Sequence, residues 1–462
     1  MSTTSKHPYR RGWLRRGVVV LAALLLQGCS DVLKVTDPDI ILDANSAQGA
    51  LALRNGSFLR LSQAVNGIQG PDALFVFSGL MADEWRSGDT FVQRNNQDQR
   101  VFQPDNTFNA GPYRSLNRIR MESERGIAAL RTYLPDSTAA VASLFAITAY
   151  SEVLMGELYC NGTPLSRVEG SNIVFGQPLT NDSVLRLAIA NADSALAQAA
   201  LAGAAGVRWT RLASIVKARA LLDLGQYATA ATTVAAVPTT YRFMAYHSVN
   251  SNNNQVWALN NSARRYTLTN GREGGVGIDF VTANDPRVPR QIGGAVVFDN
   301  SVPMTLVRQA LYGQYDSIPV ATGIEARLIQ AEAQLQAGDS IGWLAALNTM
   351  RTDTTLYPRL GTGFAYGTTI PKGAALTALA MPPDRAAQVD VHFSERAFWM
   401  FSTGHRLGDM RRLLRQYGRA EAQVYPNGTF IKGGTYSDAV QMPVPFDEEN
   451  NPNFTGCIDR LP

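Results

Sequence analysis

Apolar residues return every three or four positions along most of the chain. The clearest stretch follows Thr180, a suitable helix N-cap, and runs through Leu185, Ala188, Ile189, Ala192, Leu196 and Ala199. This spacing predicts an amphipathic helix. Similar patterns predict helices over residues 43–66, 112–130, 137–159, 211–224, 227–238 and 325–351. The predicted fold class is therefore all-α dominated.

Two of these segments predict helical hairpins. Residues 211–238 are interrupted at Gly225, and residues 325–351 are interrupted at Gly338. Alanine and glycine stand where the two helices of each pair would cross closely, as they do in tetratricopeptide repeats. We therefore expect a tetratricopeptide-like scaffold of about four hairpins, interrupted rather than regularly repeated.

Two long interruptions separate the helical segments. Residues 86–111 and 240–320 carry Asn, Gly, Pro and aromatic residues without a helical period. Short β-like runs at 277–281 and 295–298 predict a few small hairpins there. Loops of this length in a compact protein are commonly functional or disordered, so they are the first place to look for a site.

The N-terminus predicts export and a lipid anchor. A basic stretch ends at Arg16, and the apolar run 18–26 that follows is too short to span a bilayer core of roughly 30 Å. This arrangement is typical of a secretory signal peptide. The run leads into Leu26-Gln27-Gly28-Cys29, which places a thiol directly after a small residue, as in lipoprotein signals. We expect removal of residues 1–28 and lipidation of Cys29.

The positive net charge of the chain comes from the signal segment, and the remaining residues are close to neutral. The formal net charge is +4, and removing the five positive charges of residues 1–28 leaves about −1 over the remaining residues. Binding to a nucleic-acid backbone needs a cationic face. The charge therefore argues against nucleic acid as a partner.

The remaining cysteines and histidines give no metal signature. Cys160 and Cys457 are the two thiols left after Cys29. Thiols of exported proteins are commonly paired, but the separation along the chain leaves both a disulfide and two free thiols open. His247, His392 and His405 lack the i,i+4 spacing that places two imidazoles around zinc. We expect no metal and no cofactor.

The sequence gives little support for an enzyme. It contains no phosphate loop with Gly-Lys-Ser/Thr and no His-Glu-x-x-His motif. Carboxylate pairs such as Asp83-Glu84 and Glu448-Glu449 could serve sugar hydrolysis, but any chain with this many acids offers such doublets. We expect a protein without catalytic residues.

The C-terminal third carries the most specific pattern. In order it contains Glu395-Arg396, Gly404-His405-Arg406 and Asp409-Met410-Arg411-Arg412. This order closely resembles the SusD/RagB family of outer-membrane nutrient-binding lipoproteins. Further pieces agree in order: Ala331-Glu332-Ala333, Leu347-Asn348, Tyr425-Pro426-Asn427-Gly428, Pro443-Val444-Pro445 and Asn451-Pro452-Asn453, with Cys29-Ser30-Asp31-Val32-Leu33 as the mature start. Trp399 and Thr403 depart from the family pattern, which commonly has acids at these places.

The resemblance implies a surface-exposed, lipid-anchored outer-membrane protein. Such a protein binds an oligosaccharide, or sometimes a peptide, and delivers it to a SusC-like TonB-dependent transporter. We expect a body over 29–462, divided into a helical part (29–238), a loop-rich insertion (239–322) and a C-terminal SusD/RagB-like part (323–462). The alternatives are a surface glycan hydrolase and a structural subunit of a surface complex that binds peptides or no ligand.

The aromatic loops are the predicted ligand site. Sugar rings stack on aromatic faces, and their hydroxyls need polar partners. Loops 86–111 and 240–280 offer both, and we expect them to form one shallow exposed site. The candidate residues are Trp85, Arg86, Trp257, Asn260, Asn261 and Tyr266. By contrast, Trp343 and Trp399 fall in helical patterns and are expected in the core, and the charged residues of 406–412 are expected to form structural ion pairs.

Overall fold

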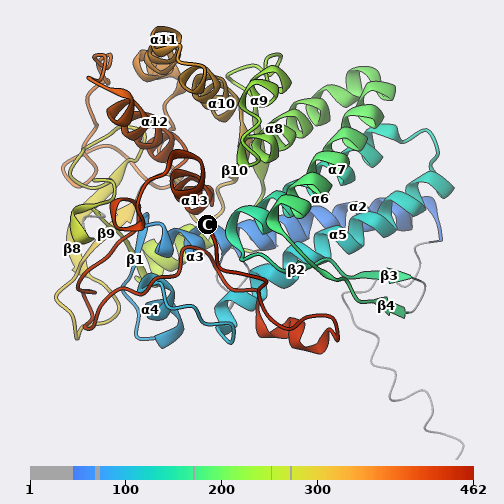
Figure 1. The fold of residues 1–462 in the computed structure, drawn as a ribbon, viewed down its shortest axis with the longest axis horizontal. Helices are drawn as coiled ribbons and strands as arrows, with labels where there is room; N and C mark the ends of the chain where they lie inside the picture. Colours follow the sequence, from blue (N-terminus) through green and yellow to red (C-terminus); the bar gives the residue numbers. More distant parts are fainter. Residues whose placement is uncertain (1–44, 68–72, 170–171, 251, 271–272) are drawn as a thin grey trace, which may run out of the picture. The chain divides into compact units, whose positions relative to one another are not determined.

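Long helices packed side by side form much of the body of the computed structural model (Figure 1). It describes residues 45–67, 73–169, 172–250, 252–270 and 273–462, so the predicted signal peptide and Cys29 lie outside the described residues. The helices are α2 (Ala47–Asn66), α3 (Leu74–Met81), α4 (Val92–Asp98), α5 (Thr107–Tyr133), α6 (Thr138–Leu158), α7 (Asn181–Leu201), α8 (Val207–Asp223), α9 (Tyr227–Thr233), α10 (Gly323–Gln336), α11 (Ser340–Thr352), α12 (Arg385–Trp399), α13 (Arg406–Tyr417) and α14 (Glu421–Val424). The predicted fold class is confirmed.

Consecutive helices pack as hairpins. Helix α6 contacts α5 and α7, α8 contacts α7 and α9, and α10 contacts α9 and α11. The predicted breaks are confirmed, since Gly225 (φ 72°) and Gly338 (φ 80°) adopt the left-handed conformation that ends a helix. The Thr180 side chain caps α7 by accepting a hydrogen bond from the Ser183 N–H, 3.2 Å away.

Helix α6 is the central helix of this scaffold. It is the one helix in the described part of the chain that is long and apolar enough to cross a membrane, and 78% of its most apolar window is buried. It contacts α5, α7 and α8. The apolar residues of α6 therefore serve the protein core.

The strands form two-stranded antiparallel ribbons that join distant segments. The pairs are β1 (Trp85–Ser87) with β7 (Tyr266–Leu268), β2 (Thr163–Pro164) with β5 (Pro178–Leu179), β3 (Arg167–Glu169) with β4 (Asn172–Val174), β6 (Arg242–Ala245) with β10 (Ile318–Thr322), and β8 (Arg290–Val296) with β9 (Thr305–Gln309). The β1–β7 pair brings the two long interruptions of the sequence together. The β6–β10 pair brackets the loop-rich segment just before α10 begins.

The predictions for the loops were partly wrong. Residues 277–281 form no strand, whereas the run at 295–298 overlaps the end of β8, which forms a hairpin with β9. Residues 86–111 include α4 and the start of α5. Helix α4 lacks an apolar stripe because its buried side chains are polar: Arg94, Gln97 and Asp98. A hydrophobic pattern cannot reveal such a helix.

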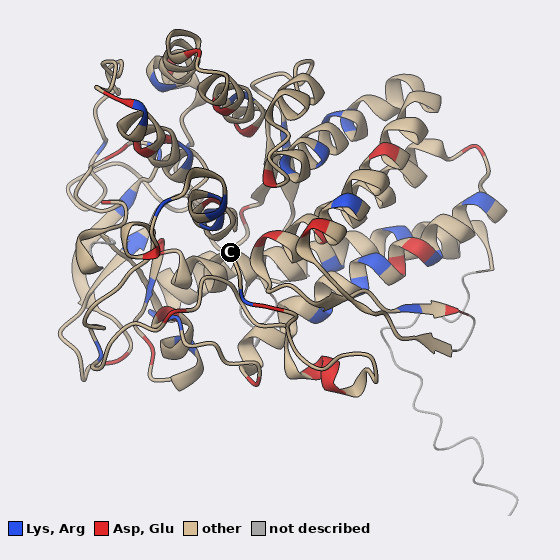
Figure 2. Cartoon of the chain, viewed as in Figure 1, with Lys and Arg blue, Asp and Glu red and all other residues tan. Residues whose placement is uncertain are grey.

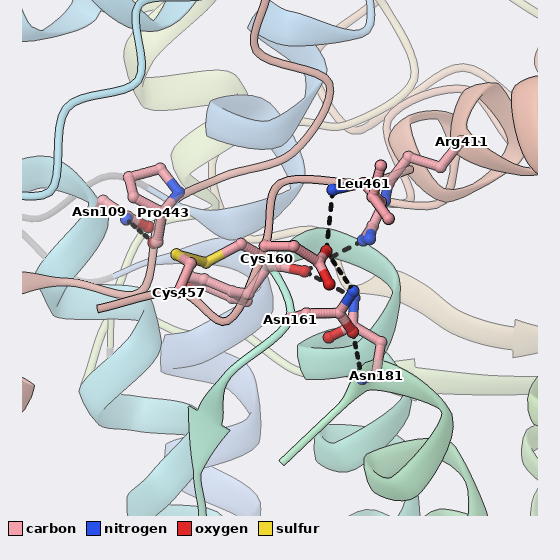
Figure 3. Close-up of a disulfide and its surroundings, with 10 residues drawn as sticks. Asn109, Cys160, Asn161, Asn181, Arg411, Pro443, Cys457 and Leu461 are labelled. Carbon is pink, nitrogen blue, oxygen red and sulfur yellow. Dashed lines mark hydrogen bonds between the residues drawn. A yellow bond between two sulfur atoms is a disulfide. The ribbon is translucent and has the colours of Figure 1, made fainter. Parts of the chain in front are cut away.

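A disulfide between Cys160 and Cys457 ties the C-terminal tail to the segment after α6 (Figure 3). The Cys160 residue is fully buried. Beside the disulfide, the Asn161 side chain donates to the Asp459 carboxylate at 2.7 Å, and its backbone carbonyl accepts from the Ile458 N–H at 2.8 Å. The tail is therefore held by hydrogen bonds as well as by the covalent link.

Acidic and basic residues are interspersed over the helices and loops (Figure 2). Many of them meet in the interior, where Arg219 and Glu325 form one ion pair at 2.6 Å and Arg396 and Asp409 form another at 2.9 Å. The near-neutral body thus consists largely of matched charges rather than of separate faces of opposite sign.

Candidate functional site

Trp85 and Tyr266, two of the predicted ligand residues, lie in the core. Both side chains are fully buried. Side chains alternate along β1, so Trp85 and Ser87 point inward while Arg86 is only half-buried. The Trp85 ring packs against Phe401, with 5.4 Å between the ring centroids. The expectation that these aromatic rings face a ligand is therefore corrected.

Asn260 and Asn261 connect backbone segments. The buried Asn260 amide donates to the carbonyls of Tyr266 (2.8 Å) and Val307 (3.1 Å), and its oxygen accepts from the Gln309 N–H (2.8 Å). Asn261 exchanges two further hydrogen bonds with Gln309, at 2.8 and 2.6 Å. These amides hold the turn at 257–262 against β7 and β9, so their hydrogen-bonding groups are used inside the protein.

Arg86 lines a cavity of about 420 Å³ between β1, β7 and β9. The two predicted loops do meet here, because Arg86 is paired with Thr267 across the β1–β7 ribbon. The wall is otherwise made of threonine, Asn270 and aliphatic residues, and none of the described residues that line it is aromatic. This cavity, which we call the Arg86 cavity, offers hydrogen bonds but no ring on which a sugar could stack.

Trp257 is half-buried at the start of a short π-helical turn, Trp257–Ser262. Its backbone N–H is capped by the Asn254 side chain at 3.3 Å. Trp257 borders none of the cavities described here.

A larger cavity, of about 560 Å³, opens beside Trp399 at the end of α12. We call it the Trp399 cavity. Its walls come from β6, the segment 311–317, β10, the segment 355–361, and residues 398–403. Trp399 and Tyr357 are both half-buried, and their ring centroids are 5.9 Å apart. Aromatic faces and a concave wall are the two features that the predicted loop site lacked.

Polar groups surround the Trp399 cavity. Arg242 and Arg359 are exposed, and neither guanidinium has a hydrogen-bond or ion-pair partner among the described residues. Asp316 accepts hydrogen bonds from Gly313 N–H (2.7 Å) and from Thr362 N–H (2.6 Å). Burial opposes ionisation of this carboxyl, but these hydrogen bonds lower its pKa. The cavity therefore presents two free cations and one fixed carboxylate.

A row of packed aromatic side chains supports the wall of the Trp399 cavity. Phe401 contacts Trp85 on one side and Phe280 on the other, with 4.9 Å between the centroids of Phe280 and Phe401. The buried Arg287 guanidinium lies 5.1 Å from the Trp399 ring and is held by Asp285 and by Glu395 at 2.6 Å. Trp85 thus packs behind the wall of this cavity, through its contact with Phe401.

Trp399 is the residue that sequence reasoning misplaced. Helical periodicity predicts it in the core, and that prediction is correct for Trp343, which is fully buried and donates to His392 at 3.2 Å. Trp399 ends α12 and borders a cavity together with Thr403. The available signal was that these two positions depart from the family pattern.

Most of the charged residues in 406–412 are structural, as predicted. Asp409 accepts two hydrogen bonds of 2.9 Å from Arg396 and one of 2.8 Å from Arg412. Arg411 donates to three backbone carbonyls at the end of α6. All four side chains are nearly fully buried. These ion pairs hold α12 and α13 against the helical scaffold.

The acidic doublets do not resemble a catalytic pair. Glu84 is fully buried, and burial raises its pKa to about 8. Asp83 is also buried with a raised pKa, and neither residue borders a described cavity. Glu448 accepts a hydrogen bond from the Tyr113 hydroxyl at 3.0 Å. No group of three or more His, Cys, Asp or Glu side chains in the described part of the chain could hold a metal ion.

Residues 338–342 spell Gly-Asp-Ser-Ile-Gly, the spacing of a serine-hydrolase elbow. Here the motif joins α10 to α11 and follows a helix rather than a strand. The Ser340 hydroxyl donates to Gln388 at 3.0 Å, and no histidine in the described part of the chain is hydrogen-bonded to it. The motif therefore serves as a helix–helix turn.

The fold is similar to that of several solved structures. No protein-family model and no curated protein matches the chain. A SusD superfamily protein from Bacteroides fragilis is 13% identical, covers 89% of this chain and 99% of its own, and has a TM-score of 0.60. One from Bacteroides thetaiotaomicron is 15% identical, with 90% and 99% covered and a TM-score of 0.59. A SusD-like carbohydrate binding protein from Bacteroides vulgatus is 12% identical, with 79% and 83% covered and a TM-score of 0.54. The resemblance predicted from motif order is thus confirmed at the level of the fold, and the chain has the fold of the SusD superfamily.

Proposed function

We propose that this protein binds an oligosaccharide in the Trp399 cavity without catalysing a reaction. The observation that carries the proposal is the half-buried Trp399–Tyr357 pair in a cavity of about 560 Å³ that also presents two unpaired guanidinium groups. Ligand pockets of this size combine apolar faces with a few fixed polar groups. One of the similar solved structures is a carbohydrate binding protein by name, which supports the same class of ligand.

The chemistry of the cavity suits sugar rings. The apolar face of a pyranose stacks on an indole or phenol ring, and its hydroxyls accept hydrogen bonds from guanidinium groups such as those of Arg242 and Arg359. The Tyr357 ring is held in place because its hydroxyl donates to the Arg351 carbonyl at 2.5 Å. A fixed ring loses little conformational entropy when a ligand binds.

Trp399→Ala should weaken oligosaccharide binding by about ten-fold or more. Losing one stacking aromatic face is worth roughly 1 to 3 kcal/mol by analogy with burial of a large side chain. The measurement is calorimetric titration with an oligosaccharide selected on a glycan array. Trp399→Phe retains an aromatic face and should keep most of the affinity.

Matched variants separate this site from the loop site suggested by the sequence. Trp257→Ala removes a half-buried tryptophan that borders no described cavity, and should leave binding unchanged. Loss of binding in Trp257→Ala with full binding in Trp399→Ala would move the site to the loops. Turnover of the sugar by pure protein would favour the glycan hydrolase, and failure to bind across glycan and peptide arrays would favour the structural subunit.

We further propose that the protein is anchored in the outer membrane through a lipid on Cys29 and delivers its ligand to a SusC-like TonB-dependent transporter. The support is the apolar run 18–26 followed by Gly28-Cys29. Cys29→Ala should therefore give unprocessed or released protein, because no other thiol stands at that place. Membrane fractionation tests this. Processed Cys29→Ala protein that still partitions into the outer membrane would contradict the lipid anchor.

A further inference from the structure

Arg406 differs from the other arginines of its motif. It is the first residue of α13 and is 7% exposed. Its Nε and Nη1 atoms are buried without a hydrogen-bond partner, and no ion pair to its guanidinium occurs within the described residues. Arg396 and Arg412, by contrast, both bind Asp409. Buried guanidinium groups are normally paired, so this one needs an explanation.

The neighbouring carboxyls supply only part of the counter-charge. Asp409 is already engaged by Arg396 and Arg412. Burial raises the pKa of Glu84 to about 8, so this carboxyl is largely neutral at pH 7, and burial raises the pKa of Asp83 as well. Asp409, Glu84 and Asp83 attract the Arg406 guanidinium, but burial outweighs this attraction and lowers the pKa of Arg406, so its charge is only partly compensated.

Arg406 lines a cavity of about 350 Å³, which we call the Arg406 cavity. The lining includes the segment 275–278, where Gly275 and Gly277 have positive φ and no side chain to fill the space. Arg419 and Asp390, which also line it, neutralise each other at 2.7 Å. The lining thus carries one net positive charge, and it shares no residue with the Trp399 cavity.

We propose that the Arg406 cavity binds one small oxyanion, for which the buried Arg406 guanidinium is the counter-charge. A planar guanidinium matches carboxylate, sulfate and phosphate oxygens bidentately. The backbone at Gly275 and Gly277, which carries no side chain, lets the anion approach closely. The anion is either an inorganic ion or the acid group of a sugar acid, which share this chemistry.

The test is calorimetric titration of the full chain with three probes: sodium sulfate, sodium phosphate and sodium glucuronate, each against sodium chloride at matched ionic strength. At least one of the three should bind, and Arg406→Met should weaken that binding by ten-fold or more. Tighter binding of glucuronate identifies a sugar acid as the ligand, and tighter binding of sulfate or phosphate identifies an inorganic ion. Absence of binding by all three, or equal binding in Arg406→Met, overturns the proposal.

Arg415→Met is the matched control. Arg415 lies on the same helix, is exposed, and lines no described cavity, so this change should leave anion binding intact. The thermal midpoint of Arg406→Met without anion should equal or exceed that of the unaltered protein, because a buried charge without an ion-pair partner has been removed. If Arg406→Met does not fold, anomalous diffraction from crystals of the unaltered protein soaked in selenate decides: selenate in the Arg406 cavity supports the proposal, and its absence overturns it. Oligosaccharide binding at the Trp399 cavity should survive Arg406→Met, so the two proposals fail independently.

Discussion

Asp409→Ala is expected to lower the free energy of unfolding by about 3–5 kcal/mol, because it leaves two buried guanidinium groups without their shared carboxylate. Asp409 is 4% exposed and accepts hydrogen bonds of 2.9, 2.9 and 2.8 Å from Arg396 and Arg412. Once the carboxylate is gone, the buried Arg396 has no ion-pair partner among the described residues, whereas Arg412 keeps its ion pair with Glu332. Equilibrium denaturation at pH 7 measures the loss.

The control is Asp390→Ala, which removes a carboxylate whose side chain is 67% exposed from its ion pair with Arg419. An exposed pair of this kind contributes about 0–1 kcal/mol. Equal losses in the two variants would contradict the structural role of the Asp409 ion pairs.

The contribution of Asp409 to the free energy of unfolding also depends on pH. Burial alone would raise the pKa of this carboxyl, but Arg396 and Arg412 lower it to about 2. A carboxyl whose pKa is depressed in the folded state contributes stability that is present above its ordinary value and is lost as the pH falls toward 2. The difference in the free energy of unfolding between Asp409→Ala and the unaltered protein should therefore become smaller below pH 4.

Removing the disulfide is the second large expected effect. The double change Cys160→Ser and Cys457→Ser opens a link between residues 297 positions apart. In the chain-entropy description, a loop of this length stabilises the folded state by up to about 5 kcal/mol, since it restricts the unfolded chain. Denaturation of the oxidised protein, the reduced protein and the double variant gives the size of the effect.

Reduction should lower the stability of the unaltered protein to that of the double variant. Reductant should not change the stability of the double variant. Two freely alkylated thiols in natively exported protein would contradict the disulfide. A loss below about 1 kcal/mol would contradict the chain-entropy estimate, and would mean that hydrogen bonds such as Asn161 to Asp459 already hold the tail.

The sequence did not predict which aromatic residues of the candidate site are buried. Placing Trp85 in a loop was close to correct, because it lies in a three-residue strand outside the helical scaffold. Its burial depends on pairing with residues 266–268 and on contact with Phe401, both far away along the chain. Local composition cannot distinguish a loop aromatic that supports a wall from one that faces a ligand.

Local sequence patterns are enough to predict the helical scaffold, because helices depend on contacts three and four residues apart. The pattern 185–199, the cap at Thr180 and the breaks at Gly225 and Gly338 are all local signals, and each appears in the structure as predicted. The order of the C-terminal motifs likewise predicted the SusD-like fold.

Local patterns do not reveal which side chains meet a cavity, because this depends on packing between distant segments. Trp343 and Trp399 have the same helical pattern, yet one is fully buried and the other lines an opening that residues 311–319 and 355–361 leave beside α12. Cys160 and Cys457 are likewise brought together only by the path of the C-terminal tail. The physical reason is the same in both cases: periodicity fixes the face of a helix on which a residue lies, while burial depends on segments that pack against that face from far away in the chain.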